Sequence, residues 1–557
     1  MKERLFVALA ALTLGWFLAL LVAAPELGSL ATDLPGTLND DALGAIHLHH
    51  DFHDAVREGR LDLVDPDQLV PAGSDRWLRE GGNSLEMVVS GVFRLFLPWP
   101  MWLTAAALAW IPLNLLAFVP LGRRLWGRWV PALAVGAAWA VLPPVLTQLG
   151  AMRLTQMVLV GVPIAVLGWL QVIDGEKRGR WVLGAGMALT AWGYWFYGLF
   201  LVVLAPVFLV AVWRARRSEG VLDVARAAGL AAGLSLPLMS RPIWARLSGA
   251  WTPSSPASAE FSSPVFADAL QLVGEQSAHA AGWCPWVLLV GFGATAAWGS
   301  RRLLWGALAG ICVVFALGPA QQIGELVWLL PGYPFWRWVP GFDRMLHPER
   351  WLHVGGLFLV VLAADGMARF KPWLTLLLPV GVLLQRPSLG HWSPAPPAVW
   401  NAVAATEGVG VIVVPLLESP LSCAWQPFHG KRLLGGMGEN QPWFRPPAFE
   451  AFIESNSLLM QLWMLGRGED VRVQVYQADL EALRVQGLDL VVLDAGAWAR
   501  APLAGRVDAR SRLQEAFGAP LSDDVSGQLW ALPAAGRAGT PPSMGPLQSE
   551  GPPGPPP

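Results

Sequence analysis

The residues best suited to chemistry lie near the N-terminus, between positions 39 and 54. Asn39, Asp40 and Asp41 open a stretch that continues as Ala-Leu-Gly-Ala-Ile-His-Leu-His-His-Asp-Phe-His-Asp. The two aspartates stand at the start of a predicted helix, where a carboxylate can cap free backbone N–H groups and complement the helix dipole. The same carboxylates could instead serve as a general base or a metal ligand for an arriving substrate. The local pattern leaves both uses open.

Histidines and carboxylates repeat along this predicted helix at helical spacing. His47, His50, Asp51 and Asp54 fall at i, i+3, i+4 and i+7, which places them on one face, with His53 beside them. Imidazole and carboxylate groups on one face can hold a divalent cation, with His47, His50 and Asp54 as the candidate ligands. A solvated polar face with helical ion pairs is the alternative.

A second cluster of polar residues lies late in the chain, between Phe335 and Trp351. Four potential cations are interleaved there with aromatic residues: Arg337, Arg344, His347 and Arg350. Arginine binds phosphate oxygens with two parallel hydrogen bonds, so Arg344, His347 and Arg350 form a candidate phosphate site. Anchoring of tryptophan and arginine to lipid head groups is the alternative. A further basic patch, Gln426–Arg432, is interpreted as structural.

The composition requires a membrane around much of the chain. Of 557 residues, 54% are hydrophobic and 14% charged, and the mean hydropathy is +0.44. Soluble domains are usually about 25% charged. The net charge of −2 gives no reason to expect nucleic acid as a partner. Three widely spaced cysteines match no metal or redox pattern.

Eleven apolar segments between residues 5 and 385 are candidate transmembrane helices. The first follows Lys2 and Arg4 and is interpreted as an uncleaved helix rather than a signal peptide, because Pro25 makes a poor cleavage site. Several of the others are shorter than the roughly 20 residues that a perpendicular span needs. The predicted spans cover residues 5–24, 101–121, 129–149, 154–173, 181–196, 199–213, 222–240, 284–299, 303–319, 351–368 and 372–385.

Positive charge gathers on every second connection between these segments. The basic connections include Arg123 and Arg124, Lys177 and Arg178, while the short turn at 150–153 holds one cation, Arg153. By the positive-inside rule the N-terminus is cytoplasmic and the C-terminus lies outside. The aromatic stretch Gly193–Gly198 is then an outer turn at the membrane interface.

Four longer regions fall on the outer side: residues 25–100, 241–283, 320–350 and 386–557. In the first, Asp41–Glu58 and Ser84–Phe96 are predicted as helices lying in the interface plane. In the last, Gly408–Pro415, Val471–Tyr476 and Leu488–Asp494 are predicted strands and Leu480–Val485 a helix. The predicted organisation is a transmembrane domain at 1–385, an extracytoplasmic α/β domain at 386–535 and a disordered Gly/Pro-rich tail at 536–557.

Four features together resemble the GT-C superfamily of integral-membrane glycosyltransferases, in its large uncharacterised bacterial branch. They are the pair Asp40–Asp41 after the first helix, the stretch from Glu58 to the Pro71–Gly73 loop, the late Pro340–Trp351 motif, and an outer domain with Val-Ile-Val-Val-Pro followed by Gln-Pro-Phe-His-Gly-Lys. The resemblance covers about residues 1–500. It implies a bundle of about eleven transmembrane helices with a C-terminal α/β domain.

The resemblance also implies an activity. Members of the superfamily typically take hexosyl donors linked to polyprenyl phosphate, and an aspartate of the first outer loop acts as base while the anomeric configuration inverts. That role falls on Asp41 first and Asp40 second. Similar sequences often carry an arginine where this chain has Leu346, and Arg344 is displaced by two positions. This chain thus departs from the pattern of the family in the loop to which the phosphate-binding role is assigned.

The resemblance also gives the expected surroundings of the protein, which are a lipid-linked donor, membrane lipids and the inner membrane of a bacterium. A non-catalytic polytopic protein, either a transporter or an assembly factor for cell-envelope polymers, is the alternative class. Few ionisable residues lie within the predicted spans, which disfavours an ion-coupled transporter.

Overall fold

The computed structural model describes residues 2–24, 28–59, 64–75, 84–248, 300–323, 326–339, 342, 348–384, 389–417, 420–436, 439, 445–500 and 507–533. The predicted span 284–299 and the predicted tail 536–557 lie outside the described residues. The chain divides into two compact units. The first unit contains Met1–Leu61 and Arg76–Ala395, and the second contains Asp62–Asp75 and Pro396–Pro557.

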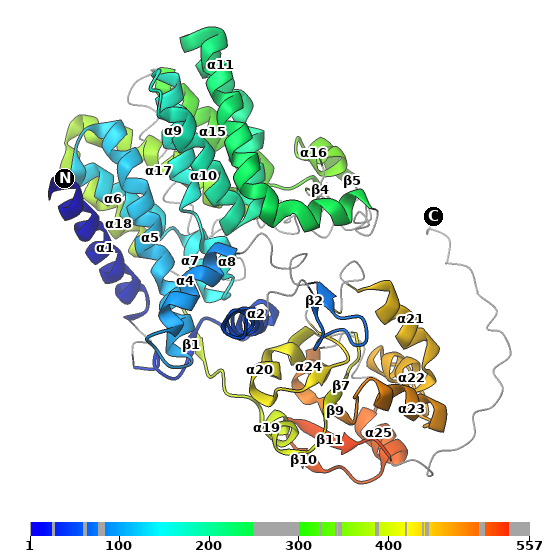
Figure 1. The fold of residues 1–557 in the computed structure, drawn as a ribbon. Helices are drawn as coiled ribbons and strands as arrows, with labels where there is room; N and C mark the ends of the chain where they lie inside the picture. Colours follow the sequence, from blue (N-terminus) through cyan, green and yellow to red (C-terminus); the bar gives the residue numbers. More distant parts are fainter. Residues whose placement is uncertain are drawn as a thin grey trace. The chain divides into compact units, whose positions relative to one another are not determined.

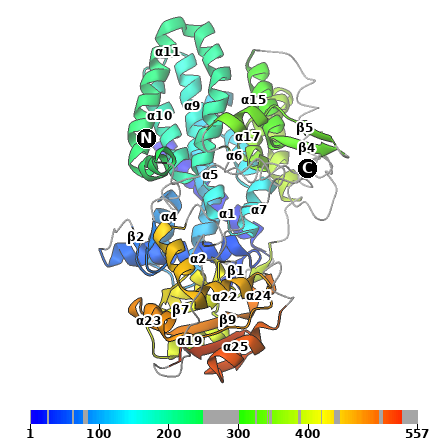
Figure 2. The ribbon, with the colours of Figure 1, turned by 90° about the vertical axis from the view of Figure 1, so that its right-hand side faces the viewer.

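The first unit is a helical bundle. In chain order its elements are α1 (Lys2–Val22), β1 (Leu34–Pro35), α2 (Asp40–Arg57), α4 (Ser84–Arg94), α5 (Met101–Trp126), α6 (Trp129–Ala140), α7 (Pro143–Gly150), α8 (Leu154–Met157), α9 (Gly161–Ile173), α10 (Gly179–Gly193), α11 (Trp195–Leu247), α15 (Ser300–Ala316), β4 (Ala320–Ile323), β5 (Leu326–Leu329), α16 (Tyr333–Trp338), η3 (Pro348–Arg350), α17 (Trp351–Phe370), η4 (Pro372–Leu376), α18 (Leu377–Leu383) and β6 (His391–Trp392). Figures 1 and 2 show α5, α9, α10 and α11 running side by side.

Five helices of the described part are long and apolar enough to cross a membrane, or six if the bent pair α6 and α7 forms one span. These helices do not establish the predicted number of eleven transmembrane helices. The longest, α11, is two helices joined at Arg217, whose φ of 55° and ψ of −138° break the helical path. The predicted spans 199–213 and 222–240 fall on either side of that break. Helices α15 and α18 are apolar but shorter.

Close helix packing holds the bundle together where side chains are small. A Cβ atom on Gly186 of α10 would lie 2.3 Å from the backbone nitrogen of Ala165 in α9. No side chain fits in that space, so the two helices can approach closely only with glycine at this position. Small residues at helix contacts are the usual way in which apolar helices associate in lipid, where hydrophobic burial gives no driving force.

The second unit is an α/β domain built on a five-stranded sheet, and its order is β10-β11-β9-β7-β8. Strand β7 is parallel to β8 and β9, whereas β11 is antiparallel to β9 and β10. The elements are β2 (Val64–Asp65), β3 (Ser74–Asp75), α19 (Ala398–Ala405), β7 (Gly410–Val414), η5 (Pro420–Trp425), α20 (Gln426–His429), β8 (Arg432–Leu433), α21 (Pro447–Ser455), α22 (Ser457–Gly466), α23 (Gln477–Val485), β9 (Leu490–Asp494), α24 (Ala495–Arg500), α25 (Ala509–Phe517), β10 (Ser522–Asp524) and β11 (Gly527–Ala531).

The buried strands β7 and β9 confirm two of the sequence predictions. Every residue of both strands is buried, as expected for central parallel strands covered on both faces. Ile412 and Val414 of β7 pack with Leu459 and Leu462 of α22 in the hydrophobic core. Helix α23 confirms the predicted helix, whereas Val471–Tyr476 forms no strand beyond an isolated bridge at its last residue. Alternation alone predicted that strand wrongly, because the segment makes no ladder with the sheet.

Residues 64–75 belong to the second unit, whereas the predicted domain boundaries put them in the transmembrane domain. Strands β2 and β3 form a hairpin, and its turn buries Leu69 and Val70 in the core of the α/β domain. The backbone N–H of Leu433 donates to the Asp67 carbonyl oxygen at 2.8 Å, and that of Leu69 donates to Gly435 at 2.9 Å. This hairpin is thus an added part of the α/β domain.

The basic patch Gln426–Arg432 contacts the same hairpin. The Gln426 amide donates to the Asp67 carbonyl at 2.8 Å, and Arg432 pairs with the Asp67 carboxylate at 3.2 Å. Lys431 donates to two backbone carbonyls, and the His429 ring stacks on Trp400. These contacts are of the kind that the structural interpretation of this patch predicts.

The charge pattern predicts that the second unit lies outside the membrane and that the break in α11 lies on the cytoplasmic side. Val525 in the second unit and Ser218 after the break in α11 are both exposed to solvent. In a background without Cys284, Cys312 and Cys423, we expect the variant Val525→Cys to react with an impermeant maleimide on intact cells. The variant Ser218→Cys should react only after the cells are opened. Labelling of Ser218→Cys alone on intact cells would reverse the predicted topology.

Candidate functional site

The aspartate pair occupies the first turn of α2. Asn39 is the N-cap, and its side-chain oxygen accepts from the backbone N–H of Ala42 at 2.9 Å. Asp40 and Asp41 therefore take the first two helical positions, and the cap bond comes from Asn39. The Asp40 side chain lies outside the described part of the structure. The Asp41 carboxylate is thus available for another role.

Arg153 is the residue that holds Asp41. Its Nε donates to Asp41 Oδ2 at 2.5 Å, and among the described residues no other side chain contacts this carboxylate. The Asp41 side chain is 50% exposed, so solvent or a ligand can reach it. Arg153 is the lone cation of the 150–153 turn, and no sequence pattern indicates that it pairs with a residue 112 positions earlier.

Further contacts join the start of α2 to this turn. The backbone N–H of Thr37 donates to the Gly150 carbonyl at 2.9 Å, and the Asn39 amide donates to Ala151 at 3.3 Å. Gly36 has a φ of +96°, and a Cβ there would lie 2.2 Å from the Gly150 oxygen. Only glycine fits this approach and this backbone conformation. The position of Asp41 is consequently set by backbone contacts as well as by its ion pair.

Arg350 is the second charged group of the site. It ends the short helix η3 and is 9% exposed. One of its terminal nitrogens donates to the Tyr194 hydroxyl, and the guanidinium lies 5.5 Å from the Tyr194 ring centre. Its Nε is buried without a hydrogen-bond partner, and no described carboxylate pairs with it. Burial of an uncompensated cation is costly, so this group is suited to an incoming anion.

Tyr194 contacts Arg350 and lies within electrostatic range of Arg153. Arg153 acts electrostatically on the Tyr194 hydroxyl, as do Arg350 and Glu349. Tyr194 and Tyr197 are both buried, and the Tyr197 hydroxyl donates to the Gln156 carbonyl at 2.6 Å. The prediction that this aromatic turn anchors to the membrane interface is therefore wrong for the two tyrosines, whose hydroxyls are used inside the protein.

Sequence reasoning missed two glutamines in this part of the bundle. Gln148 of α7 and Gln156 of α8 are buried, and amide atoms of both lack hydrogen-bond partners. The signal that could have found them is a polar amide inside an apolar segment, because buried polar groups are nearly always satisfied. The other two predicted phosphate ligands, Arg344 and His347, lie outside the described residues.

The histidines of α2 pack against α4 and the start of α5. The ligand atoms of His47, His50 and Asp54 do not all lie within 4.8 Å of one another. Asp54 pairs with Arg94 at 2.7 Å, and the His50 ring packs edge-on against Trp99 and Trp102. The structure thus does not bring the three predicted ligands together, because Asp54 is paired with Arg94 and His50 is packed against tryptophans.

His49 and His53 form a hydrogen-bonded cluster with Ser90 of α4. Ser90 Oγ lies 2.6 Å from His49 Nδ1 and 3.1 Å from His53 Nε2. Burial lowers the pKa of His49, His50 and His53, that of His50 to about 3. The neighbouring Arg94 lowers the pKa of His50 further. These side chains are therefore neutral near pH 7.

The chemical capacity of the site follows from its charges. Asp41 offers a half-exposed carboxylate that can accept a proton. Arg350 offers guanidinium N–H groups to an anion, and Arg153 adds a second positive charge near the same tyrosine. A carboxylate base beside cations suits transfer reactions in which a hydroxyl attacks and a phosphate leaves.

Comparison with solved structures gives a match over nearly the whole chain. The mycobacterial arabinofuranosyltransferase AftD superposes with a TM-score of 0.55 at 15% identity, over 96% of this chain and 42% of that one. The oligosaccharyltransferase of Archaeoglobus fulgidus gives a TM-score of 0.46 at 11% identity, over 88% of this chain and 70% of that one. No family model and no curated protein sequence matches. The likeness to AftD confirms the predicted resemblance at the level of the fold, which is that of the GT-C membrane glycosyltransferases.

The buried histidines predict a loss of stability in acid. The pKa of each histidine in the folded protein lies below the usual 6.5. Once the pH falls below 6.5, the unfolded chain therefore binds more protons than the folded chain does. For His50 the difference amounts to about 2 kcal/mol at pH 5 relative to pH 7.5. We expect the thermal unfolding temperature of the purified protein to fall between these pH values. The variant His50→Phe should show a smaller fall, and an equal fall would contradict the assignment.

Proposed function

We propose that this protein is a membrane glycosyltransferase that moves a sugar from a polyprenyl-phosphate donor to an acceptor on the outer side of a bacterial inner membrane. Two observations in the first unit support it. The buried Arg350 lacks a carboxylate partner among the described residues, and the half-exposed Asp41 is held by Arg153. The GT-C fold supports the same class of reaction.

In the proposed reaction an acceptor hydroxyl attacks the anomeric carbon of the sugar. Asp41 takes the hydroxyl proton as the new C–O bond forms, and the bond from the anomeric carbon to the phosphate oxygen breaks. The electron pair of that bond leaves with the polyprenyl phosphate. Direct displacement inverts the anomeric configuration. Asp40 is the second candidate for the base.

The leaving group determines what the other residues need to do. A phosphate gains negative charge as it departs and needs cations rather than an acid. Arg350 is positioned to donate hydrogen bonds to it, and the predicted set extends to Arg344 and His347. No divalent cation is required by this scheme, and the candidate ligands His47, His50 and Asp54 stay outside it.

The orientation of the enzyme follows from the charge pattern. The N-terminus is cytoplasmic, and the α/β domain and the start of α2 are extracytoplasmic. The donor then reaches Asp41 from the outer leaflet. The alternative, a non-catalytic assembly factor for cell-envelope polymers, does not account for a buried arginine that lacks a carboxylate partner among the described residues.

Removal of the base should abolish transfer. We expect Asp41→Asn to lower the rate of sugar transfer by about 10²-fold or more, since a general base contributes roughly that factor. The measurement is the transfer of labelled sugar in isolated membranes supplied with polyprenyl-phosphate donors. Glu58→Gln, a carboxamide change just after the other end of α2, is the matched control and should leave the rate unchanged.

The same assay separates the two aspartates. Loss of activity in Asp40→Asn but not in Asp41→Asn would move the role of base to Asp40. Wild-type rates in both variants, with folded protein at normal levels, would show that neither is the base.

Removal of the phosphate ligand should weaken the use of the donor. We expect Arg350→Ala to lower kcat/KM for the lipid-phosphate donor by about 10²-fold, because it removes hydrogen-bond donors from a developing negative charge. Arg350→Lys should keep part of the activity, because lysine keeps the charge but loses the planar geometry. Arg337→Ala removes an exposed arginine of the same loop and serves as control. Equal effects of Arg350→Ala and Arg337→Ala would contradict a specific role for Arg350.

A further inference from the structure

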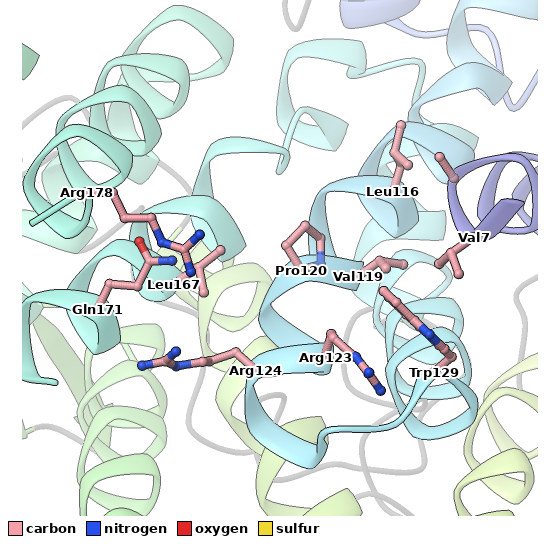
Figure 3. Close-up of a pocket in the computed structure, with 11 residues that line it drawn as sticks. Val7, Leu116, Val119, Pro120, Arg123, Arg124, Trp129, Leu167, Gln171 and Arg178 are labelled. Atoms are coloured by element: carbon pink, nitrogen blue, oxygen red, sulfur yellow. The ribbon is translucent and has the colours of Figure 1, made fainter. Parts of the chain in front are cut away.

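The first unit contains a cavity that the proposed reaction does not use. It has a volume of about 620 Å³ and lies among α1, α5, the start of α6, α9 and the α9–α10 connection (Figure 3). Its residues belong to the end of the bundle where Arg123, Arg124 and Arg178 lie. The positive-inside rule assigns that end to the cytoplasm, away from the outer turn that contains Arg153.

One wall of the cavity is apolar and opens beside a helix suited to contact lipid. Val7 of α1, Leu116 of α5 and Leu167 of α9 line it. On α1, the neighbouring Leu5, Phe6 and Leu9 are all exposed in the structure. An exposed apolar surface on a membrane-spanning helix faces acyl chains. The apolar wall is therefore continuous with a surface on which a lipid chain can lie.

Three arginines also line the cavity: Arg123, Arg124 and Arg178. Arg124 pairs with Asp174 at 2.6 Å and with Glu176, and Arg178 pairs with Glu176 at 2.7 Å. Arg123 has no carboxylate partner among the described residues. Its guanidinium lies 4.5 Å from the Trp129 ring centre and donates to the Gly127 carbonyl. Figure 3 shows these three arginines around the cavity.

The Trp129 ring, which contacts Arg123, has Glu3 as a further partner. Trp129 Nε1 donates to the Glu3 carboxylate at 2.7 Å, and Glu3 makes no ion pair with Arg123 in the described structure. One guanidinium therefore remains free to bind a monoanion. A phosphodiester group carries that charge and accepts the forked hydrogen bonds of arginine.

Gln171 supplies an independent indication of a polar ligand. This residue of α9 is 4% exposed and lines the cavity, and its Oε1 is buried without a hydrogen-bond partner. An unsatisfied buried acceptor of this kind is unfavourable, because it has lost its hydrogen bonds to water. A ligand that donates a hydrogen bond removes this cost. The hydroxyl groups of a glycerol head group are such donors, whereas choline has none.

We propose that this cavity binds one anionic phospholipid with a hydroxyl-bearing head group, taken from the cytoplasmic leaflet. The phosphodiester contacts Arg123, with Arg178 and Arg124 beside it, and a head-group hydroxyl donates to Gln171. An acyl chain follows the apolar wall toward α1. Basic pockets between transmembrane helices on the cytoplasmic side commonly bind lipids in this way. The site is separate from the glycosyl-transfer site and does not depend on that activity.

The test is lipid retention by the purified full-length protein in detergent, measured by native mass spectrometry. The probes are phosphatidylglycerol, phosphatidylcholine with the same chains, and glycerol 3-phosphate, which carries the head group without chains. We expect one phosphatidylglycerol to bind at least tenfold more tightly than phosphatidylcholine, and glycerol 3-phosphate to bind far more weakly. Equal binding of the two lipids, or binding of glycerol 3-phosphate as tight as that of the lipid, would overturn the proposal.

Variants assign the site. The double variant Arg123→Ala with Arg178→Ala should lose phosphatidylglycerol by at least tenfold, and Gln171→Leu should weaken it several-fold without removing a charge. Arg226→Ala, which removes an exposed arginine of α11 outside the cavity, is the matched control and should bind as the wild type does. Wild-type retention by the double variant, or an equal loss in Arg226→Ala, would place the lipid elsewhere. Gln171→Leu keeps the test decisive if the double variant does not fold.

Discussion

The attachment of the α2 N-terminus to the turn between α7 and α8 is the constraint on which the candidate site depends. An exposed ion pair contributes only about 0–1 kcal/mol, so the contact between Asp41 and Arg153 does not fix this geometry by itself. The backbone bond from Thr37 to Gly150 and the close approach of Gly36 supply the rest. The helix is thereby held with its first turn, and the Asp41 carboxylate, at one end of the bundle.

The second feature of the site is a buried charge, Arg350, that has no carboxylate partner among the described residues. Arg350 lies in a short 3-10 helix, with the Tyr194 hydroxyl as its hydrogen-bond partner. Elsewhere in the bundle the buried Arg302 pairs with Asp365 at 2.7 Å, which is the usual arrangement for a cation in an apolar surrounding. Arg350 has no such partner among the described residues, and this observation is the basis for the proposed contact with a phosphate. The buried Gln148 and Gln156 also have amide atoms without hydrogen-bond partners.

The helices and central strands could be predicted from the sequence because their signals are local. Helix α2 starts at Asp40, and α4 begins at Ser84, as expected from capping residues and apolar spacing. Contacts between distant segments could not be predicted in this way. Nothing in residues 64–75 shows that this hairpin joins the core of the α/β domain, and helical spacing alone could not tell a metal face on α2 from one packed on tryptophans. The contact of Asp41 with Arg153 and the hydrogen bond from Arg350 to Tyr194 also depend on tertiary packing.

Two motifs that carry the resemblance, the Pro71–Gly73 loop and the Gln426–Lys431 stretch, belong to one small module of the second unit. Gln426 contacts the hairpin that contains the loop.

The proposed function requires that the protein transfers a sugar from a lipid-phosphate donor. The most direct measurement supplies isolated membranes containing the wild-type protein with a panel of labelled polyprenyl-phosphate sugars and follows the label out of the donor lipid. We expect at least one donor to lose its sugar to an acceptor. The anomeric configuration of the sugar in the product should be inverted relative to that in the donor. If folded protein transfers no sugar from any donor of the panel, the chain is not the enzyme proposed here and the non-catalytic alternative is favoured.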